Sequence, residues 1–200
     1  MKNKWNAIAR IVGLTCIPAM SLFVLMLINY MIFLKTGVIE NIYLQVVIMY
    51  GIPIILSLCL LPVKLTKYSL KDIGICRNKR GYQDIILFLG MGILISVFFI
   101  KKEMAEMEGA YVIQFLFVGI GEEIFFRSIL YKSIKEICNS EIIAVICVAF
   151  IFGCLFHMDG GMGALLLVRV PLSVVFSYIY LKTESLSIPI VLHSLYNILV

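Results

Sequence analysis

The chain has 200 residues, of which 62% are hydrophobic and only 14% are charged. A soluble domain of this length needs more polar side chains to cover its surface, so the composition excludes an ordinary soluble fold and indicates an integral membrane protein. The net charge of +5 does not indicate nucleic-acid binding, because the lysines and arginines fall mostly between the apolar segments.

Apolar segments separated by short polar stretches follow one another along the whole chain. Each is long enough for a helix, and most approach the roughly 20 residues that a hydrocarbon core needs. They predict an all-α, polytopic membrane bundle of about seven transmembrane helices, with six as the alternative, in a single domain over 1–200. The segments lie at about 11–34, 42–62, 85–100, 110–130, 142–158, 164–181 and 188–200.

The lysines and arginines between these segments predict the orientation. With the N-terminus inside and alternating spans, only Lys35, Lys101 and Lys102 fall outside. Such a positive-inside bias favours an inside N-terminus. The inside set is Lys2, Lys4, Arg10, Lys64, Lys67, Lys71, Arg77, Lys79, Arg80, Lys132, Lys135 and Lys182.

Three charged residues interrupt the apolar segment at 110–130, in the stretch GEEIFFR. Glu123 and Arg127 are four residues apart, with the acid first, which is the favourable ion-pair arrangement on one helix face. Glu122 is rotated about 100° from Glu123, so it is predicted to face elsewhere. Ionisable residues within a membrane usually face an interior cavity and mark function.

The two histidines, His157 and His193, both lie in or beside late apolar segments. A single buried histidine is often only a hydrogen-bonded core residue, but two of them with a spare glutamate can complete a catalytic site. Asn197 follows His193 by four residues, so the two side chains share one helix face. Asn197 does not titrate and would serve as a hydrogen-bond donor.

Two assignments of these residues are open, and both give hydrolysis of an acyl bond. In the first, Glu122 is a general base that activates water with help from His157, while His193 and Asn197 donate hydrogen bonds to the oxyanion. In the second, Glu122, His157 and His193 ligate zinc and leave one position for water. The HExxH helix of soluble metalloproteases is absent from the sequence. The metal-free assignment, without a cofactor, is preferred.

These residues resemble the motifs of the CPBP family of intramembrane endopeptidases, which includes CAAX-processing and bacteriocin-processing proteases. The first motif, two glutamates and an arginine, matches Glu122, Glu123 and Arg127, although Ser128 replaces the usual glycine. The second places phenylalanine four residues before histidine, whereas here Phe152 precedes His157 by five. The third, histidine and asparagine four residues apart, matches HSLYN at 193–197. The motif-bearing core therefore covers about 110–200.

The resemblance implies a glutamate-dependent protease. In the family, the residues that match Glu122 and His157 activate water, and those that match His193 and Asn197 stabilise the oxyanion. The residues that match Glu123 and Arg127 support the site. The expected partners are membrane lipids and a peptide or protein substrate at the membrane, and the expected location is a bacterial cytoplasmic membrane.

Two other classes of protein compete with this reading. A non-catalytic membrane protein, such as a bacteriocin immunity or partner-binding factor, could retain the motifs. A small transporter could use charges at the membrane midplane to bind a substrate. Transporters of that kind usually show paired halves, which the sequence lacks.

Overall fold

The computed structural model describes residues 2–37, 39–69, 72–73, 92, 106–156 and 161–199, and every regular element within these ranges is helical. This confirms the all-α expectation for the described part of the chain. The helices, with π-helical stretches labelled η, are α1 (Lys2–Thr36), α2 (Ile42–Val46), η1 (Val47–Gly51), α3 (Ile52–Ile54), η2 (Ile55–Leu60), α4 (Leu61–Thr66), α6 (Glu106–Glu123), η3 (Ile124–Leu130), α7 (Tyr131–Cys138), α8 (Glu141–Phe156), α9 (Gly161–Ala164), η5 (Leu165–Arg169), α10 (Val170–Thr183) and α11 (Ser187–Leu199).

Four of the described helical runs are long and apolar enough to cross a membrane: Asn6–Thr36, Ile42–Thr66, Met107–Cys138 and Gly161–Thr183. The helices α8 and α11 are also apolar but shorter, with 16 and 13 residues. At 1.5 Å per residue they extend about 20–24 Å, less than a hydrocarbon core of about 30 Å. The segment expected at 85–100 lies outside the described residues except for Gly92. The count of seven and the inside N-terminus therefore stay predictions.

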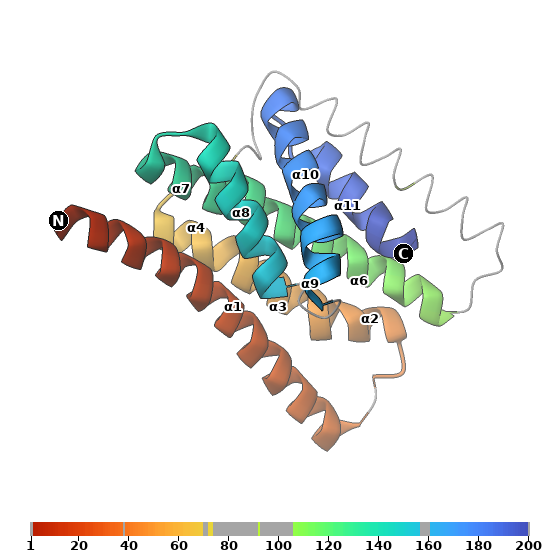
Figure 1. Cartoon of the computed structure of the whole chain (residues 1–200). Helices are drawn as coiled ribbons and strands as arrows, with labels where there is room; N and C mark the ends of the chain where they lie inside the picture. The colour runs from red at the N-terminus through yellow and green to blue at the C-terminus, as the bar shows by residue number, and fades with distance from the viewer. Residues whose placement is uncertain are drawn as a thin grey trace.

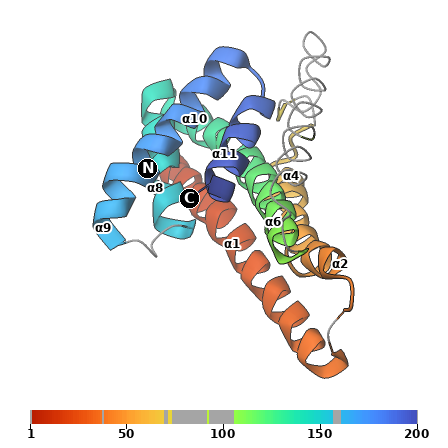
Figure 2. The same ribbon diagram turned by 90° about the vertical axis from the view of Figure 1, so that its right-hand side faces the viewer.

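Helix α6 lies at the centre of the described bundle (Figure 1). It packs against α11 on one side and against α2 on the other, while α8 contacts both α7 and α10. Helix α1 runs along η1, α3 and η2, and its C-terminal end extends beyond the other helices in both views (Figures 1 and 2). This arrangement places two helices from the C-terminal part of the chain, α10 and α11, beside the charged motif on α6 and η3.

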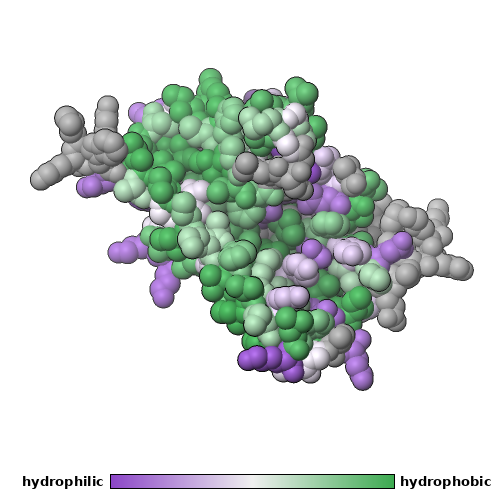
Figure 3. Space-filling model, turned by 60° about the horizontal axis from the view of Figure 1, so that its bottom comes forward, coloured by the Kyte–Doolittle hydropathy of each residue, from purple (hydrophilic) through white to green (hydrophobic). Residues whose placement is uncertain are grey.

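Hydrophobic side chains cover much of the exterior, as the space-filling view shows (Figure 3). Phe23, for example, is 67% exposed and Leu167 is 80% exposed. Charged and polar side chains are buried instead, among them Glu122, Glu123 and His193. A protein that exposes its large apolar residues and buries ionisable ones is organised for lipid surroundings. The chain is an integral membrane protein.

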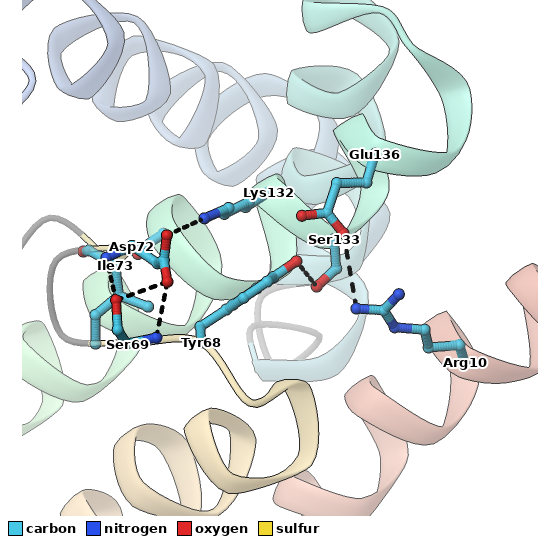
Figure 4. Close-up of polar contacts among 9 residues, drawn as sticks. Arg10, Tyr68, Ser69, Asp72, Ile73, Lys132, Ser133 and Glu136 are labelled. Atoms are coloured by element: carbon cyan, nitrogen blue, oxygen red, sulfur yellow. Dashed lines mark hydrogen bonds and ion pairs between the residues drawn. The ribbon is translucent and has the colours of Figure 1, made fainter.

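The segment that follows α4 is fastened to the helix that carries the charged motif (Figure 4). The Ser128 hydroxyl donates to the carbonyl of Ile73 at 2.7 Å, and the Ile73 side chain is buried. The Lys132 ammonium lies 3.0 Å from Asp72 Oδ1. Hydrogen bonds from the Ser69 hydroxyl and backbone N–H, together with Lys132, hold the pKa of Asp72 well below its usual value. The residue that replaces the motif glycine thus anchors this segment.

Two further contacts tie α7 to its neighbours at the same end of the bundle (Figure 4). The hydroxyls of Tyr68 and Ser133 lie 3.3 Å apart. About one turn further along α7, Glu136 lies 3.7 Å from the Arg10 guanidinium of α1. Burial raises the pKa of the Tyr68 hydroxyl, so this group stays neutral and can share a hydrogen bond with Ser133. The end of the motif helix is therefore held by both α1 and the segment after α4.

Candidate active site

The charged motif lies on a helix that continues from α6 through η3 into α7 without a break, and every residue of η3 is buried. This stretch is apolar on all sides except for its charges, which is the pattern of a helix surrounded by protein. π-helical turns often occur at functional sites because they change the direction of side chains within a helix. The carboxylates and the guanidinium therefore lie in the interior of the bundle, away from lipid.

Glu123 and Arg127 form the ion pair that their spacing predicts. Arg127 Nε lies 3.1 Å from Glu123 Oε2, and both side chains are fully buried. The alignment is that of an ion pair rather than a good hydrogen bond. Arg127 Nη1 donates to the Ser173 hydroxyl of α10 at 2.9 Å, and its guanidinium lies 5.1 Å from the centre of the Phe152 ring. A buried charge needs such partners, since an unpaired one strongly destabilises a fold.

His193 of α11 bridges the two glutamates, although 70 residues separate it from Glu123 in the chain. Its Nδ1 lies 2.7 Å from Glu123 Oε1, and its Nε2 lies 3.6 Å from Glu122 Oε2. The two carboxylates therefore share one partner, although Glu122 is predicted to face elsewhere than Glu123. They leave the helix in different directions, but the two nitrogens are on different edges of one imidazole, so a single ring reaches both.

The contact with Glu123 determines which nitrogen of His193 carries a proton. A carboxylate only accepts hydrogen bonds, so at 2.7 Å Nδ1 must be the donor. Nε2 then accepts when the ring is neutral and donates when the ring carries both protons. Glu123 thus orients the ring and leaves Nε2 directed at Glu122, in the manner of a carboxylate that orients a catalytic histidine.

Of the other two predicted site residues, the structure describes Asn197 but not His157. His157 lies outside the described residues, so its distance to Glu122 is not given by the structure. Asn197 is half-buried and follows His193 by one turn of α11, as the spacing predicts. The described residues contain no group of three or more His, Cys, Asp or Glu side chains that could hold a metal ion. The third ligand of the zinc assignment, His157, is not among those residues.

Aromatic and hydroxyl side chains that the sequence reasoning missed complete the surroundings of the site. The Phe176 ring lies 5.6 Å from the His193 ring at an angle of 30°, and the Phe152 ring lies 5.9 Å away at 74°. Ser173 is fully buried and binds Arg127. One signal could have found it: Ser173 and Ser177 are four residues apart in an apolar span, where hydroxyls on one helix face indicate a buried polar contact.

The phenylalanine of the second motif lies at the site despite its shifted position. Phe152 packs against both His193 and Arg127. Gly153 occupies the position where the family has phenylalanine, and a Cβ there would overlap Leu165 of η5. The small residue at 153 therefore allows α8 and η5 to pack closely, while Phe152 supplies the aromatic ring one position earlier.

Comparison with known proteins supports the same reading. The family model described as "Type II CAAX prenyl endopeptidase Rce1-like" matches residues 108–199. This C-terminal part of the chain is similar to the CAAX endopeptidase family. The match covers the sequence positions of the three motifs, from within α6 to the end of α11. No curated protein and no solved structure matches the chain.

Proposed function

We propose that the chain is an intramembrane endopeptidase that hydrolyses a peptide bond of a membrane-associated peptide or protein with a water molecule activated by Glu122. One observation carries the proposal: the imidazole of His193 lies between Glu122 and Glu123 in a buried site, inside the segment that matches the CAAX endopeptidase family. Acid, base and hydrogen-bond donor are the groups that acyl transfer requires.

The contacts of the two glutamates indicate different roles, support for Glu123 and general base for Glu122. Glu123 is held by Arg127 on one oxygen and by His193 Nδ1 on the other, so its charge is used for support. Glu122 lies 3.6 Å from His193 Nε2, which is longer than a direct hydrogen bond, and we place the reacting water beside these two atoms, within reach of the Glu122 carboxylate. In the proposed reaction Glu122 takes a proton from that water, and the hydroxide attacks the carbonyl carbon of the scissile bond.

The remaining residues act on the oxyanion and the leaving group. His157 assists Glu122 with water activation. His193 Nε2, when the ring carries both protons, and the Asn197 amide donate to the oxyanion that forms at the carbonyl. The proton taken by Glu122 then passes to the leaving amine, which restores the carboxylate. No resident metal takes part in this scheme, and the expected location is a bacterial cytoplasmic membrane.

Peptide cleavage by the purified protein in detergent micelles tests the proposal. The probes are two internally quenched peptides that end in a CAAX sequence, one prenylated and one not, because the family is described as prenyl endopeptidases. Glu122→Gln should remove nearly all turnover, since an amide cannot take a proton from water. Asn197→Ala should lower turnover by about 10²–10³ and leave measurable cleavage. Glu136→Gln, which changes a part-exposed glutamate next to Arg10, is the matched control and should cleave normally.

Chelation separates the metal-free scheme from the zinc assignment. Cleavage should survive dialysis against a strong chelator if Glu122 is the base. Stoichiometric zinc that is lost together with activity, and activity restored by added Zn²⁺, would make Glu122 a ligand instead. A folded Glu122→Gln protein that keeps the activity or cellular phenotype of the wild type would contradict the enzyme proposal and leave a binding role.

A further inference from the structure

We propose that Gly119 is a positioning residue: its close contact with the surface of α11 at Ser194 sets the separation between the Glu122 carboxylate and the His193 imidazole. The proposal rests on the proposed function, because it concerns the geometry of the same site. It assigns a role to a glycine on α6 that neither the motifs nor the ion pairs explain.

The two helices touch at Gly119. A Cβ built on this glycine would overlap the hydroxyl of Ser194 and would lie 3.3 Å from both the Ile190 carbonyl oxygen and the Ser194 nitrogen. The overlap with the hydroxyl is the severe one, because the Ser194 side chain is fully buried, whereas the two backbone atoms need to give way by only a few tenths of an ångström. Gly119 therefore lets the backbones of α6 and α11 approach as closely as they do, as small residues do in membrane helix pairs.

This contact lies next to the reacting groups on both helices. Gly119 precedes Glu122 by three residues, which is nearly one helical turn, and Ser194 directly follows His193. Helices are stiff over one turn, so a side chain wedged between them at Gly119 would move Glu122 relative to His193. The contacts of 2.7 and 3.6 Å at His193 leave little room for such a shift. A misplacement of about 1 Å at a reacting group lowers turnover about 10²-fold.

Ser194 is the surface that faces Gly119, and it does not itself orient the reacting groups. Its side chain is fully buried, and its hydroxyl has no hydrogen-bond partner among the described residues. Replacing it by alanine should therefore leave the site intact, and it should also make space for a methyl group at Gly119. Ser194→Ala should therefore restore the activity lost in Gly119→Ala. A variant that is only destabilised would not be restored in this way.

Gly121 provides a matched control on the same helix. A Cβ at Gly121 would overlap Ile54 of α3, on the side of α6 that faces the second long helix rather than α11. Gly121→Ala therefore introduces the same methyl group with a comparable collision but without a wedge between Glu122 and His193. Its effects should be insensitive to the residue at 194.

The experiment compares Gly119→Ala, Ser194→Ala, the double variant, and Gly121→Ala with and without Ser194→Ala. Gly119→Ala should lower kcat for the quenched CAAX peptides by about 10- to 100-fold with little change in KM, because substrate binding is not displaced. Ser194→Ala alone should match the wild type, and the double variant should recover most of the lost kcat. Gly121→Ala should gain nothing from Ser194→Ala.

A second measurement does not depend on cleavage. In protein with isotope-labelled histidine, the proton on His193 Nδ1 should resonate far downfield because of its hydrogen bond with Glu123, with His193→Gln used for assignment. The signal should weaken or shift in Gly119→Ala and return in the double variant. A wild type that cleaves no probe would contradict the proposed function, whereas this comparison would still test the helix contact.

Several outcomes would overturn the inference. Gly119→Ala with wild-type kcat and an unchanged His193 signal would show that the contact does not position the site. A loss that Ser194→Ala fails to restore would show that Ser194 is not the opposing surface. If Gly119→Ala does not fold, Ser194→Val introduces the wedge from α11 and should give the same loss of kcat and the same change in the signal. An unchanged Ser194→Val would refute the proposal.

Discussion

Replacing Arg127 by methionine removes the buried cation of the site and leaves the Glu123 carboxylate without its main counter-charge. Both side chains are fully buried, and breaking a buried pair by removing one partner destabilises by about 3–5 kcal/mol. Because His193 Nδ1 still contacts Glu123, we expect the lower end, about 3 kcal/mol. Methionine is similar in length and keeps the contact with Phe152, so the loss reflects charge rather than a cavity.

The assay is unfolding in mixed micelles by increasing the fraction of sodium dodecyl sulfate, followed by far-ultraviolet circular dichroism. The double variant Glu123→Gln/Arg127→Met removes both charges and should recover much of the lost free energy of unfolding, because the stranded carboxylate is gone. Lys132→Met, which removes a part-exposed ion pair, is the control and should change the free energy of unfolding far less. An Arg127→Met protein that unfolds together with the wild type and with Lys132→Met would refute the reasoning.

Three further changes test other parts of the structure. Phe126→Ala should lower the free energy of unfolding by about 3–5 kcal/mol in the same assay, because Phe126 is fully buried among three aromatic rings; a loss under about 1 kcal/mol would contradict this packing. Ser173→Ala should lower it by about 1.5–3 kcal/mol, as one hydrogen bond to the Arg127 guanidinium is lost, whereas an unchanged value would show that the bond is not formed. The pKa of Asp72 is lowered in the fold, so its contribution is present above the usual pKa of about 3.9 and is lost as the pH falls below it. Asp72→Asn should therefore unfold more easily than the wild type at pH 7, and the difference should shrink on acidification below about pH 4. A difference in stability that grows as the pH falls would contradict the lowered pKa of Asp72.

The sequence by itself determined the features that depend on local geometry and on composition. The hydrophobic segments are long, and a long apolar segment in a membrane satisfies its backbone N–H and C=O groups by forming a helix. The all-α membrane fold followed from this. The pairing of Glu123 with Arg127 also followed, because residues four apart meet on any α-helical face. The motif spacing was enough to indicate the family whose model matches residues 108–199.

Only the tertiary structure decided which distant residues meet. His193 reaches both glutamates, Ser173 binds Arg127, and Gly119 contacts Ser194, although each pair lies on separate helices. Apolar helices in lipid have many similar faces and no strong hydrophobic preference for one partner, so small residues and a few polar contacts select the packing. Those contacts depend on the relative rotation and approach of whole helices. Helical periodicity fixes where a side chain lies on its own helix, and it leaves the facing helix undetermined.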